Sequence, residues 1–172
     1  MNIRIEKGKI EQAALLNQLA KTTFIESHAH SSPPKDFKDY MDRHFTIDHL
    51  KKELANPAFE YRLLFTDDQL VAYSKLIIDT PIATVKTQNI AKLERIYLSE
   101  KFLGSGLGKT LFDYNVDLAK SNNQAGIWLF TWVENHRGIA FYKKMGFEII
   151  GSYDFQVSKT HSNPNHQMFL KF

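Results

Sequence analysis

Apolar residues recur at helical spacing in some stretches of the 172-residue chain and form short strand-like runs in others. Helical spacing, as in Leu16, Leu19 and Phe24, predicts amphipathic helices. The helices predicted in this way are Ile10–Ser27, Phe37–His44, Ile47–Asn56, Gly104–Ser121 and Asn135–Lys144. Short apolar runs bounded by turn residues predict strands. The predicted strands are Asn2–Ile5, Tyr61–Thr66, Leu70–Ile78, Lys92–Leu98, Gly126–Trp132, Phe147–Val157 and Gln167–Phe172.

This order of elements predicts an α/β (α+β) protein built around one sheet, with the last two strands as antiparallel partners. The segments between elements are short, and the loop-rich ones are Ser31–Pro34, Asp79–Asn89 and Ser158–Asn165. Long linkers mark domain boundaries, and none is visible here. We therefore expect residues 1–172 to form a single domain.

Composition and charge exclude several classes of function. The chain has no cysteine, which excludes disulfides, a thiolate nucleophile and cysteine-based zinc sites and is typical of a cytoplasmic protein. Its formal net charge is only +3, with charges of both signs interspersed, so we expect no nucleic-acid partner. The first residues lack the apolar stretch of a signal peptide, and no apolar run is long enough to span a membrane, so we expect no membrane partner.

A glycine-rich segment, Leu103–Thr110 (LGSGLGKT), follows a predicted strand and opens a predicted helix. Exposed backbone N–H groups at such a position favour a bound anion, although the glycines could also serve only a tight turn. The nucleotide loop G-x-x-x-x-G-K-[ST] would need glycine where Leu103 stands, and the dinucleotide loop G-x-G-x-x-G would need glycine at Lys109. The sequence therefore departs from each of these two patterns at one required glycine.

The stretch Leu98–Lys109 resembles the acetyl-CoA loop of the GNAT superfamily of N-acetyltransferases, [QR]-x-x-G-x-[GA], with Gly106 and Gly108 in its last two marked positions. Leu103 stands where the pattern has Gln or Arg. Downstream, Asn135–Phe147 (NHRGIAFYKKMGF) resembles the superfamily's N-x-x-A-[IVL]-x-[FL]-Y-x-x-x-G-F segment. The resemblance implies a GNAT fold, that is, a central mixed, mostly antiparallel twisted sheet of about seven strands with helices on both faces.

Two further stretches resemble bacterial spermidine/spermine N-acetyltransferases of the PaiA type: Glu94–Leu98 (ERIYL) and the block from Thr23 to Pro57. This resemblance implies acetyl-CoA-dependent transfer to a primary amine, with a polyamine as the acceptor. The absence of cysteine excludes a covalent acetyl-cysteine intermediate, so we expect direct transfer in a ternary complex.

The chemistry calls for a base, because at pH 7 an alkyl amine of pKa about 10.4 is neutral about one part in 10^3.4 of the time, a deficit of about 4.6 kcal/mol. Glu94 stands where polyamine acetyltransferases of this superfamily carry a base. Strand alternation would put it on one face with Ile96 and Leu98, opposite Leu93, Arg95 and Tyr97. It could equally be a solvated carboxylate paired with a neighbouring Lys or Arg.

The resemblance also implies roles in binding acetyl-CoA. The backbone N–H of Leu98 would stabilise the negative charge on the thioester oxygen, and Tyr142 would protonate the leaving thiolate as the acid. Asn135 would bind the pantetheine arm, and Lys143 is an alternative to Lys109 as a phosphate ligand. The full set expected to bind the cofactor is Ile96, Tyr97, Leu98, Leu103, Gly104, Ser105, Gly106, Leu107, Gly108, Lys109, Asn135 and Tyr142.

Candidate acceptor-binding residues come from the N-terminal helices and the strand that ends at Trp132. Phe24, Glu26, His28, Tyr40 and Trp132 could line an amine site, since a carboxylate would attract a cation, although the aromatic residues could simply pack in the core. His28 and His30 form a pair that lacks a nearby third ligand, so we expect no metal.

The predicted function is therefore acetyl-CoA-dependent acetylation of a small-molecule amine. Alternatives within the superfamily are acetylation of a protein N-terminus, an amino acid or an aminoglycoside-like amine. A different class is a regulator that binds acyl-CoA with little turnover. Exposed C-terminal strands could pair across a homodimer.

Overall fold

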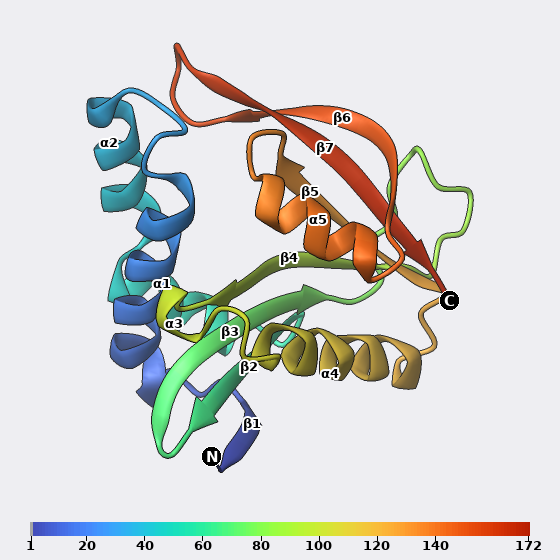
Figure 1. Cartoon of the computed structure of the whole chain (residues 1–172), viewed down its shortest axis with the longest axis horizontal. Helices are drawn as coiled ribbons and strands as arrows, with labels where there is room; N and C mark the ends of the chain where they lie inside the picture. The colour runs from blue at the N-terminus through green and yellow to red at the C-terminus, as the bar shows by residue number, and fades with distance from the viewer. Residues whose placement is uncertain (1) are drawn as a thin grey trace.

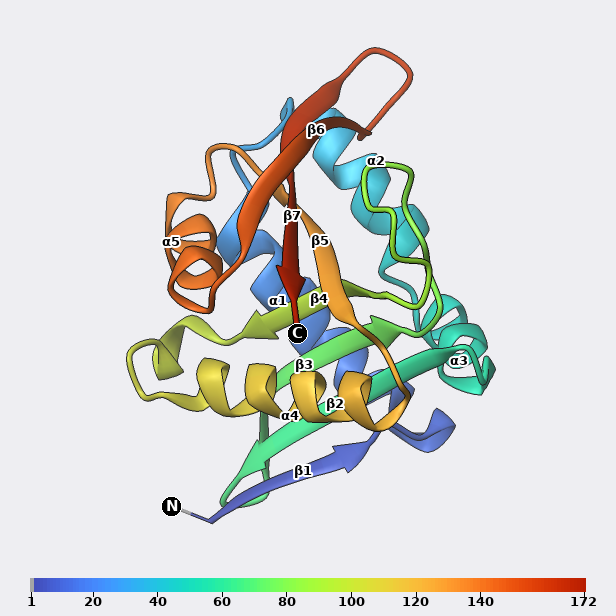
Figure 2. The same cartoon turned by 90° about the vertical axis from the view of Figure 1, so that its right-hand side faces the viewer.

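The computed structural model describes residues 2–172 and consists of one sheet with helices on both faces (Figures 1 and 2). The strands are β1 (Ile3–Lys7), β2 (Phe59–Thr66), β3 (Gln69–Ile77), β4 (Ala91–Leu98), β5 (Gly126–Trp132), β6 (Glu148–Gln156) and β7 (Ser162–Lys171). The α-helices are α1 (Ala13–His28), α2 (Pro34–His44), α3 (Ile47–Ala55), α4 (Leu107–Ser121) and α5 (His136–Lys144). Two 3-10 turns, η1 (Ile10–Gln12) and η2 (Glu100–Phe102), precede α1 and the glycine loop.

The seven strands follow the order β1-β2-β3-β4-β5-β7-β6, and neighbours are antiparallel except for the parallel pair β4–β5. This confirms the predicted fold class, a mixed and mostly antiparallel sheet of seven strands. It also confirms that the last two strands are antiparallel partners.

Strands β4 and β5 pair over a short stretch and then separate. Their register joins Ala91 to Ile127 and Lys92 to Trp128, and no pairing between them is recorded beyond that point in the described residues. Figure 2 shows β5 turning away from the direction of β4. The edge of β4 from Leu93 to Leu98 therefore faces an opening in the middle of the sheet, where backbone groups lack a strand partner.

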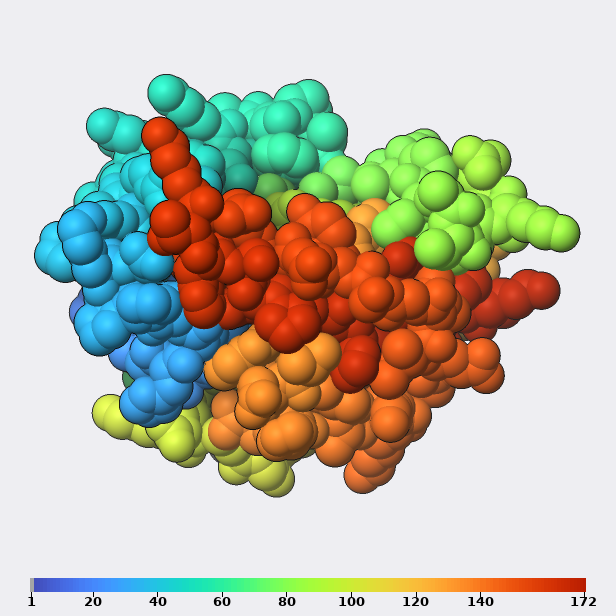
Figure 3. All heavy atoms as spheres, turned by 90° about the horizontal axis from the view of Figure 1, so that it is seen from above, coloured from blue at the N-terminus to red at the C-terminus, as the bar shows by residue number. Residues whose placement is uncertain are grey.

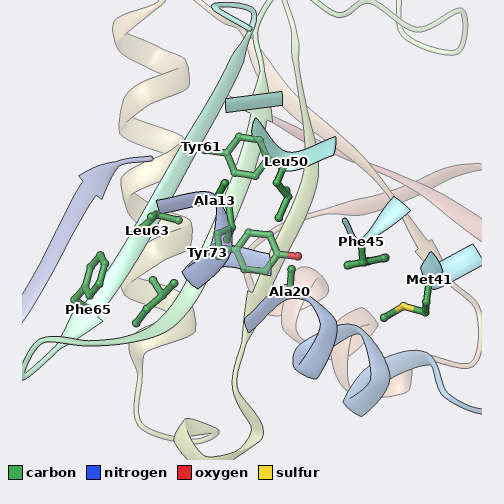
Figure 4. Packing of buried hydrophobic residues seen from close by; sticks show 11 residues of the cluster. Ala13, Ala20, Met41, Phe45, Leu50, Tyr61, Leu63, Phe65 and Tyr73 are labelled. Atoms are coloured by element: carbon green, nitrogen blue, oxygen red, sulfur yellow. The ribbon is translucent and has the colours of Figure 1, made fainter. Parts of the chain in front are cut away.

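The two faces of the sheet are covered by different helices. Helices α1 and α3 pack on one face around buried residues that include Ala20, Leu50 and Tyr73 (Figure 4). Helix α4 covers the other face through Leu111 and Phe112. Burial of large apolar side chains stabilises each layer by roughly 1.5–3 kcal/mol per side chain. Among residues 2–172, no helix is both long and apolar enough to cross a membrane.

The main difference from the sequence-based elements is the start of β7. Ser158–Asn165 was expected to be a loop, but β7 begins at Ser162 and pairs with β6 from its first residue. Its early residues are polar and include a proline, so they lack the apolar signal of a strand. Asn163 and Asn165 are nevertheless buried, because they face the interior of the molecule rather than solvent.

Candidate active site

A cavity of about 490 Å³ lies at the opening between β4 and β5. Helices α1, α2 and α3 form one wall, and β5, β6 and β7 contribute the other, so segments far apart in the sequence meet there. Its lining is rich in aromatic residues, which are Phe24, Phe37, Tyr40, Phe45, Phe59, Tyr97, Phe130, Trp132, Tyr142 and Phe155. Such a cavity is of the size that small-molecule sites usually have.

Four of the five candidate acceptor residues line this cavity: Phe24, His28, Tyr40 and Trp132. The Phe24 ring stacks on His28 with 4.7 Å between centroids, and His28 stacks on Trp132 at 6.0 Å. Burial lowers the pKa of His28 to about 4, so the imidazole is neutral at pH 7. Phe24 and Tyr40 thus line the cavity and also pack against the buried core, as the alternative for these residues expected.

Glu26, the fifth candidate, lies outside the cavity lining. Its side chain is exposed, and its Oε2 accepts a hydrogen bond of 3.1 Å from the backbone N–H of Glu100. Glu26 therefore links α1 to η2, next to the glycine loop, rather than meeting a ligand in the cavity. His30 is exposed, and no cluster of three potential metal ligands occurs among residues 2–172.

A β-bulge changes which residues of β4 face the cavity. Lys75 of β3 pairs with Arg95, but the next residue, Leu76, pairs with Leu93, so Glu94 is the extra residue. The alternation predicted for this strand is therefore wrong at its centre. Glu94 shares a face with Arg95 and Tyr97, where it contacts Lys75, whereas Leu93 packs on the α4 side with Ile96 and Leu98.

Both carboxylate oxygens of Glu94 are hydrogen bonded to lysines. Oε2 lies 2.5 Å from Nζ of Lys75, and Oε1 lies 3.2 Å from Nζ of Lys92. Burial alone would raise the pKa of Glu94, but the hydrogen bond and charge of Lys75, with Lys92 and Arg95, lower it below the usual value. Glu94 is therefore ionised at pH 7, as a proton acceptor must be. It is also paired with neighbouring lysines, as the alternative interpretation of this residue expected.

A second carboxylate, Glu53 of α3, completes a network of buried charges at the base of the cavity. Its oxygens lie 2.8 Å from Nζ of Lys75 and 3.3 Å from Nη1 of Arg95, and one accepts a hydrogen bond from the Tyr61 hydroxyl. Nε2 of His49 is 3.4 Å from the same side chain. Removing one member of such a network leaves a buried charge without a partner, which is strongly destabilising.

Glu53, Lys75 and Arg95 were not among the sequence-based site residues. Lys75 had a usable signal, since it is a lone charge inside the apolar strand LVAYSKLI and must find a partner if that strand is buried. No such signal in the sequence marks Glu53, because it lies in a polar stretch of α3 where charged residues usually face solvent.

Helix α5 brings Tyr142 and Asn135 to the cavity. Burial raises the pKa of the Tyr142 phenol, so the hydroxyl remains protonated and able to donate. The Oδ1 of Asn135 accepts a hydrogen bond of 3.0 Å from the N–H of Gly138 and so caps α5. Its side-chain amide has two donors that this bond does not use.

The glycine loop lies at the start of α4 and has the geometry of an anion cradle. Gly104 and Gly106 have φ of 77° and 84°, a left-handed conformation that favours glycine. The first N–H groups of α4, including those of Gly108 and Lys109, have no acceptor inside the helix. These features fit a phosphate group, as found at many helix N-termini. Nζ of Lys109 instead pairs with Asp113 at 2.6 Å, and Leu103 is 38% exposed.

The backbone of β4 connects the two parts of the site. The side chains of Ile96 and Leu98 pack against Leu107 and Leu111 of α4. The peptide groups of these two residues lie where β4 and β5 no longer pair, so that edge of the strand is open. An extended ligand with amide groups could pair there as an added strand would. Of the residues expected to bind the cofactor, Ile96, Tyr97, Asn135 and Tyr142 line the cavity, whereas the glycine loop lies beyond the end of β4, at the start of α4.

The sequence matches the profile of the Acetyltransferase (GNAT) family over residues 16–147. It is 26% identical over 137 residues to an uncharacterized N-acetyltransferase in the pepI 3' region of Lactobacillus delbrueckii subsp. lactis, covering 80% of this chain and 79% of the relative. The match to the family spans most of the chain, including β4, the glycine loop and α5.

Solved structures show the same fold. The PaiA N-acetyltransferase of Thermoplasma acidophilum, in complex with coenzyme A, superposes with a TM-score of 0.80 at 23% identity, covering 100% of both chains. A putative streptothricin acetyltransferase of Bacillus anthracis, in complex with acetyl coenzyme A, gives a TM-score of 0.58 at 26% identity over 70% of this chain and 66% of that one. The chain therefore belongs to the GNAT family and is an acetyl-CoA-dependent N-acetyltransferase.

Proposed function

We propose that the protein acetylates the primary amine of a small molecule that binds in the aromatic cavity, by direct transfer in a ternary complex. The observation that carries this proposal is the junction at Tyr142, where the open edge of β4 meets a cavity lined by Glu94. Acetyl-CoA supplies the acetyl thioester. The chain's own residues supply the base, the acid and the donors that orient the reactants.

The overall reaction consumes an ammonium and an acetyl thioester and yields an amide, a thiol and one proton. The amine must lose two protons, one of which ends on the leaving sulfur. In this proposal Glu94 takes the first proton, directly or through a water, because its carboxylate is ionised and borders the cavity. The protonated Tyr142 gives its proton to the leaving thiolate and takes up the second proton of the amine, so that in net terms one amine proton ends on the sulfur, while Glu94 releases the first to solvent. The N–H of Leu98 stabilises the charge on the thioester oxygen.

Binding of the cofactor follows the path along α4 and β4. The loop from Leu103 to Lys109 would hold the phosphates through its N–H groups, and the β4 edge at Ile96–Leu98 would pair with the pantetheine amides. The amide of Asn135 would bind the same arm.

A polyamine such as spermidine or spermine is the first acceptor class in this proposal. The PaiA-type resemblance of the sequence supports it, and so does the cavity wall, since aromatic faces such as Tyr40 and Trp132 attract ammonium groups. Tyr40 and Trp132 are partly buried, and such an attraction is stronger where the rings are less exposed to water.

An amine that also carries a carboxylate, such as an amino acid, is a second candidate with its own supporting observation. The cavity has three fixed cations, Lys75, Lys92 and Arg95, and two carboxylates, Glu53 and Glu94. Every oxygen of those carboxylates already has a cationic partner. A surplus of positive charge favours an acceptor with an anionic end.

The test is thiol release from acetyl-CoA in the presence of spermidine, spermine, lysine or buffer alone. Release that depends on spermidine or spermine supports the polyamine, and release that depends on lysine alone selects the second candidate. Thiol release at the buffer rate with every acceptor, together with tight acetyl-CoA binding, would favour a low-turnover regulator. Release that depends on none of these small amines but on a peptide N-terminus would indicate a protein substrate.

A further inference from the structure

Lys75 is a buried ammonium group that the reaction described above does not use. It is 2% exposed, and it stands in the centre of β3, opposite Tyr61 of β2 and Arg95 of β4. Opposite residues of neighbouring strands point to the same face of a sheet, so these three side chains form one row beneath the cavity. The row ends at the β4 bulge, where Glu94 is the extra residue.

The ammonium of Lys75 joins two carboxylates from different elements. It lies 2.8 Å from Oε1 of Glu53 on α3 and 2.5 Å from Oε2 of Glu94 on β4. It also lies 3.7 Å from the centre of the Phe59 ring. Glu53 is held in turn by Arg95 and by the Tyr61 hydroxyl. Lys75 of β3 is thus the contact that links Glu53 of α3 to Glu94 of β4.

We propose that Lys75 is a positioning residue of the acetyl-transfer site, which joins Glu53 to Glu94 and thereby keeps Glu94 ionised and fixed at the cavity wall. This inference rests on the role proposed for Glu94 as the base. Without the ammonium, the pKa of this half-buried carboxylate would rise, so it would stay protonated, and unable to accept a proton from the substrate, up to a higher pH. Glu53 has the opposite effect, because it is a nearby anion that competes for the same ammonium.

The charges around Glu94 come from every element that packs against it. These groups are Lys75 of β3, Lys92 and Arg95 of β4, Glu53 and His49 of α3, Tyr61 of β2 and Tyr40 of α2. Lys92 also contacts Glu94, but its distance is longer and its side chain is 22% exposed, so water screens it more. We therefore expect Lys75 to have the larger effect.

Replacement of Lys75 and replacement of Glu53 should shift the pKa of Glu94 in opposite directions. A purely structural role of Lys75 would not produce this pair of shifts. Lys75→Met removes a cation, so the pKa of Glu94 rises and the acid limb of kcat moves to higher pH by about one unit or more. Glu53→Gln removes an anion and leaves Lys75 wholly to Glu94, so the pKa of Glu94 falls. The matched control is Lys38→Met, which removes an exposed ammonium of α2 that pairs with Asp42.

The experiment measures two quantities on each variant of the full chain: kcat against pH at saturating acceptor, and the Glu94 carboxyl titration by carbon NMR. The Glu94 signal is assigned by its loss in Glu94→Gln. A higher Glu94 pKa in Lys75→Met, a lower one in Glu53→Gln and no change in Lys38→Met support the inference. Unchanged titration in both cavity variants, or a shift of the same sign in both, overturns it.

The same data separate this inference from the proposed role of Glu94. If Glu94→Gln retains full kcat and the wild-type pH profile, the base role fails, whatever the titrations show. If Glu94→Gln loses activity but the titrations do not move, only the role of Lys75 fails. Should Lys75→Met not fold, the double variant Lys75→Met/Glu53→Gln removes one charge of each sign, and its Glu94 pKa should exceed the wild-type value. Glu53→Gln alone still decides the matter, since a rise there contradicts the proposal.

Discussion

Single side chains in this site act according to their surroundings. Tyr142 and Glu94 both border the cavity, yet burial keeps the phenol protonated while neighbouring cations keep the carboxylate ionised. The pair therefore holds one group that can donate a proton and one that can accept it at the same pH, which is the arrangement that acid–base chemistry needs.

Replacing Tyr142 by phenylalanine should lower kcat by roughly 10²–10⁴-fold and leave acetyl-CoA affinity nearly unchanged, because it removes one hydroxyl and keeps the ring. Steady-state kinetics and a calorimetric titration with acetyl-CoA check this. A normal kcat in the variant would remove Tyr142 from the mechanism.

Glu94→Gln should make activity depend more steeply on alkaline pH. Without a carboxylate to take the proton, the acceptor must lose it to solvent, so kcat/KM should keep rising towards the amine pKa of about 10.4. A pH series of kcat/KM for variant and wild type is the measurement. Coincident profiles would point to water as the proton acceptor.

His28 should make stability sensitive to mild acid. Burial lowers its pKa from 6.5 to about 4, so the folded protein holds the imidazole neutral at pH values where the unfolded chain protonates it. Folding stability is therefore unaffected by this group above pH 6.5 and decreases as the pH falls from 6.5 towards 4. Between neutral pH and about pH 5 this loss is about 2 kcal/mol. Urea unfolding at both pH values should show that loss in wild type and a smaller one in His28→Phe, which keeps a ring that cannot be protonated. Equal losses in the two proteins would contradict it.

Whole helices and strands were largely predictable, and departures from regular geometry were not. Short apolar runs bounded by turn residues located each of the seven strands, and helical spacing of apolar residues located the helices, since burial of a face leaves these patterns in the sequence. The bulge at Glu94 was invisible to that logic, because one extra residue reverses the alternation without changing the sequence pattern. The first residues of β7 were missed because Asn163 and Asn165 are polar residues buried beside the cavity.

The glycine loop makes a prediction at the level of an element. Gly106 has φ of 84°, so Gly106→Ala should strain the backbone by roughly 1–2 kcal/mol and displace the N–H groups that open α4. Acetyl-CoA should then bind about tenfold more weakly or worse, with kcat at saturation changed less. Asp117→Asn, at an exposed position further along α4, is the control and should bind as wild type. Equal affinity of Gly106→Ala and wild type would show that the loop does not hold the phosphates.

At the scale of the whole molecule, the cavity depends on contacts between the two ends of the chain. Nε2 of His161, in the turn between β6 and β7, lies 3.0 Å from the backbone oxygen of Ser31, and the Ser158 hydroxyl donates to Asp36 at 3.1 Å. Figure 3 shows this turn lying against the α1–α2 region. Sequence alone could not place these contacts, because residues more than a hundred positions apart carry no local signal of their proximity.

Acetylation of a primary amine in this cavity is the reaction that the whole site is proposed to serve. The most direct measurement is mass spectrometry of the products after incubating the purified protein with acetyl-CoA and spermidine, spermine or lysine in separate reactions. We predict one acceptor that gains a single acetyl group on a primary amine, with one coenzyme A released per product, and loss of that product in Tyr142→Phe. Release of coenzyme A without any acetylated acceptor would contradict the account.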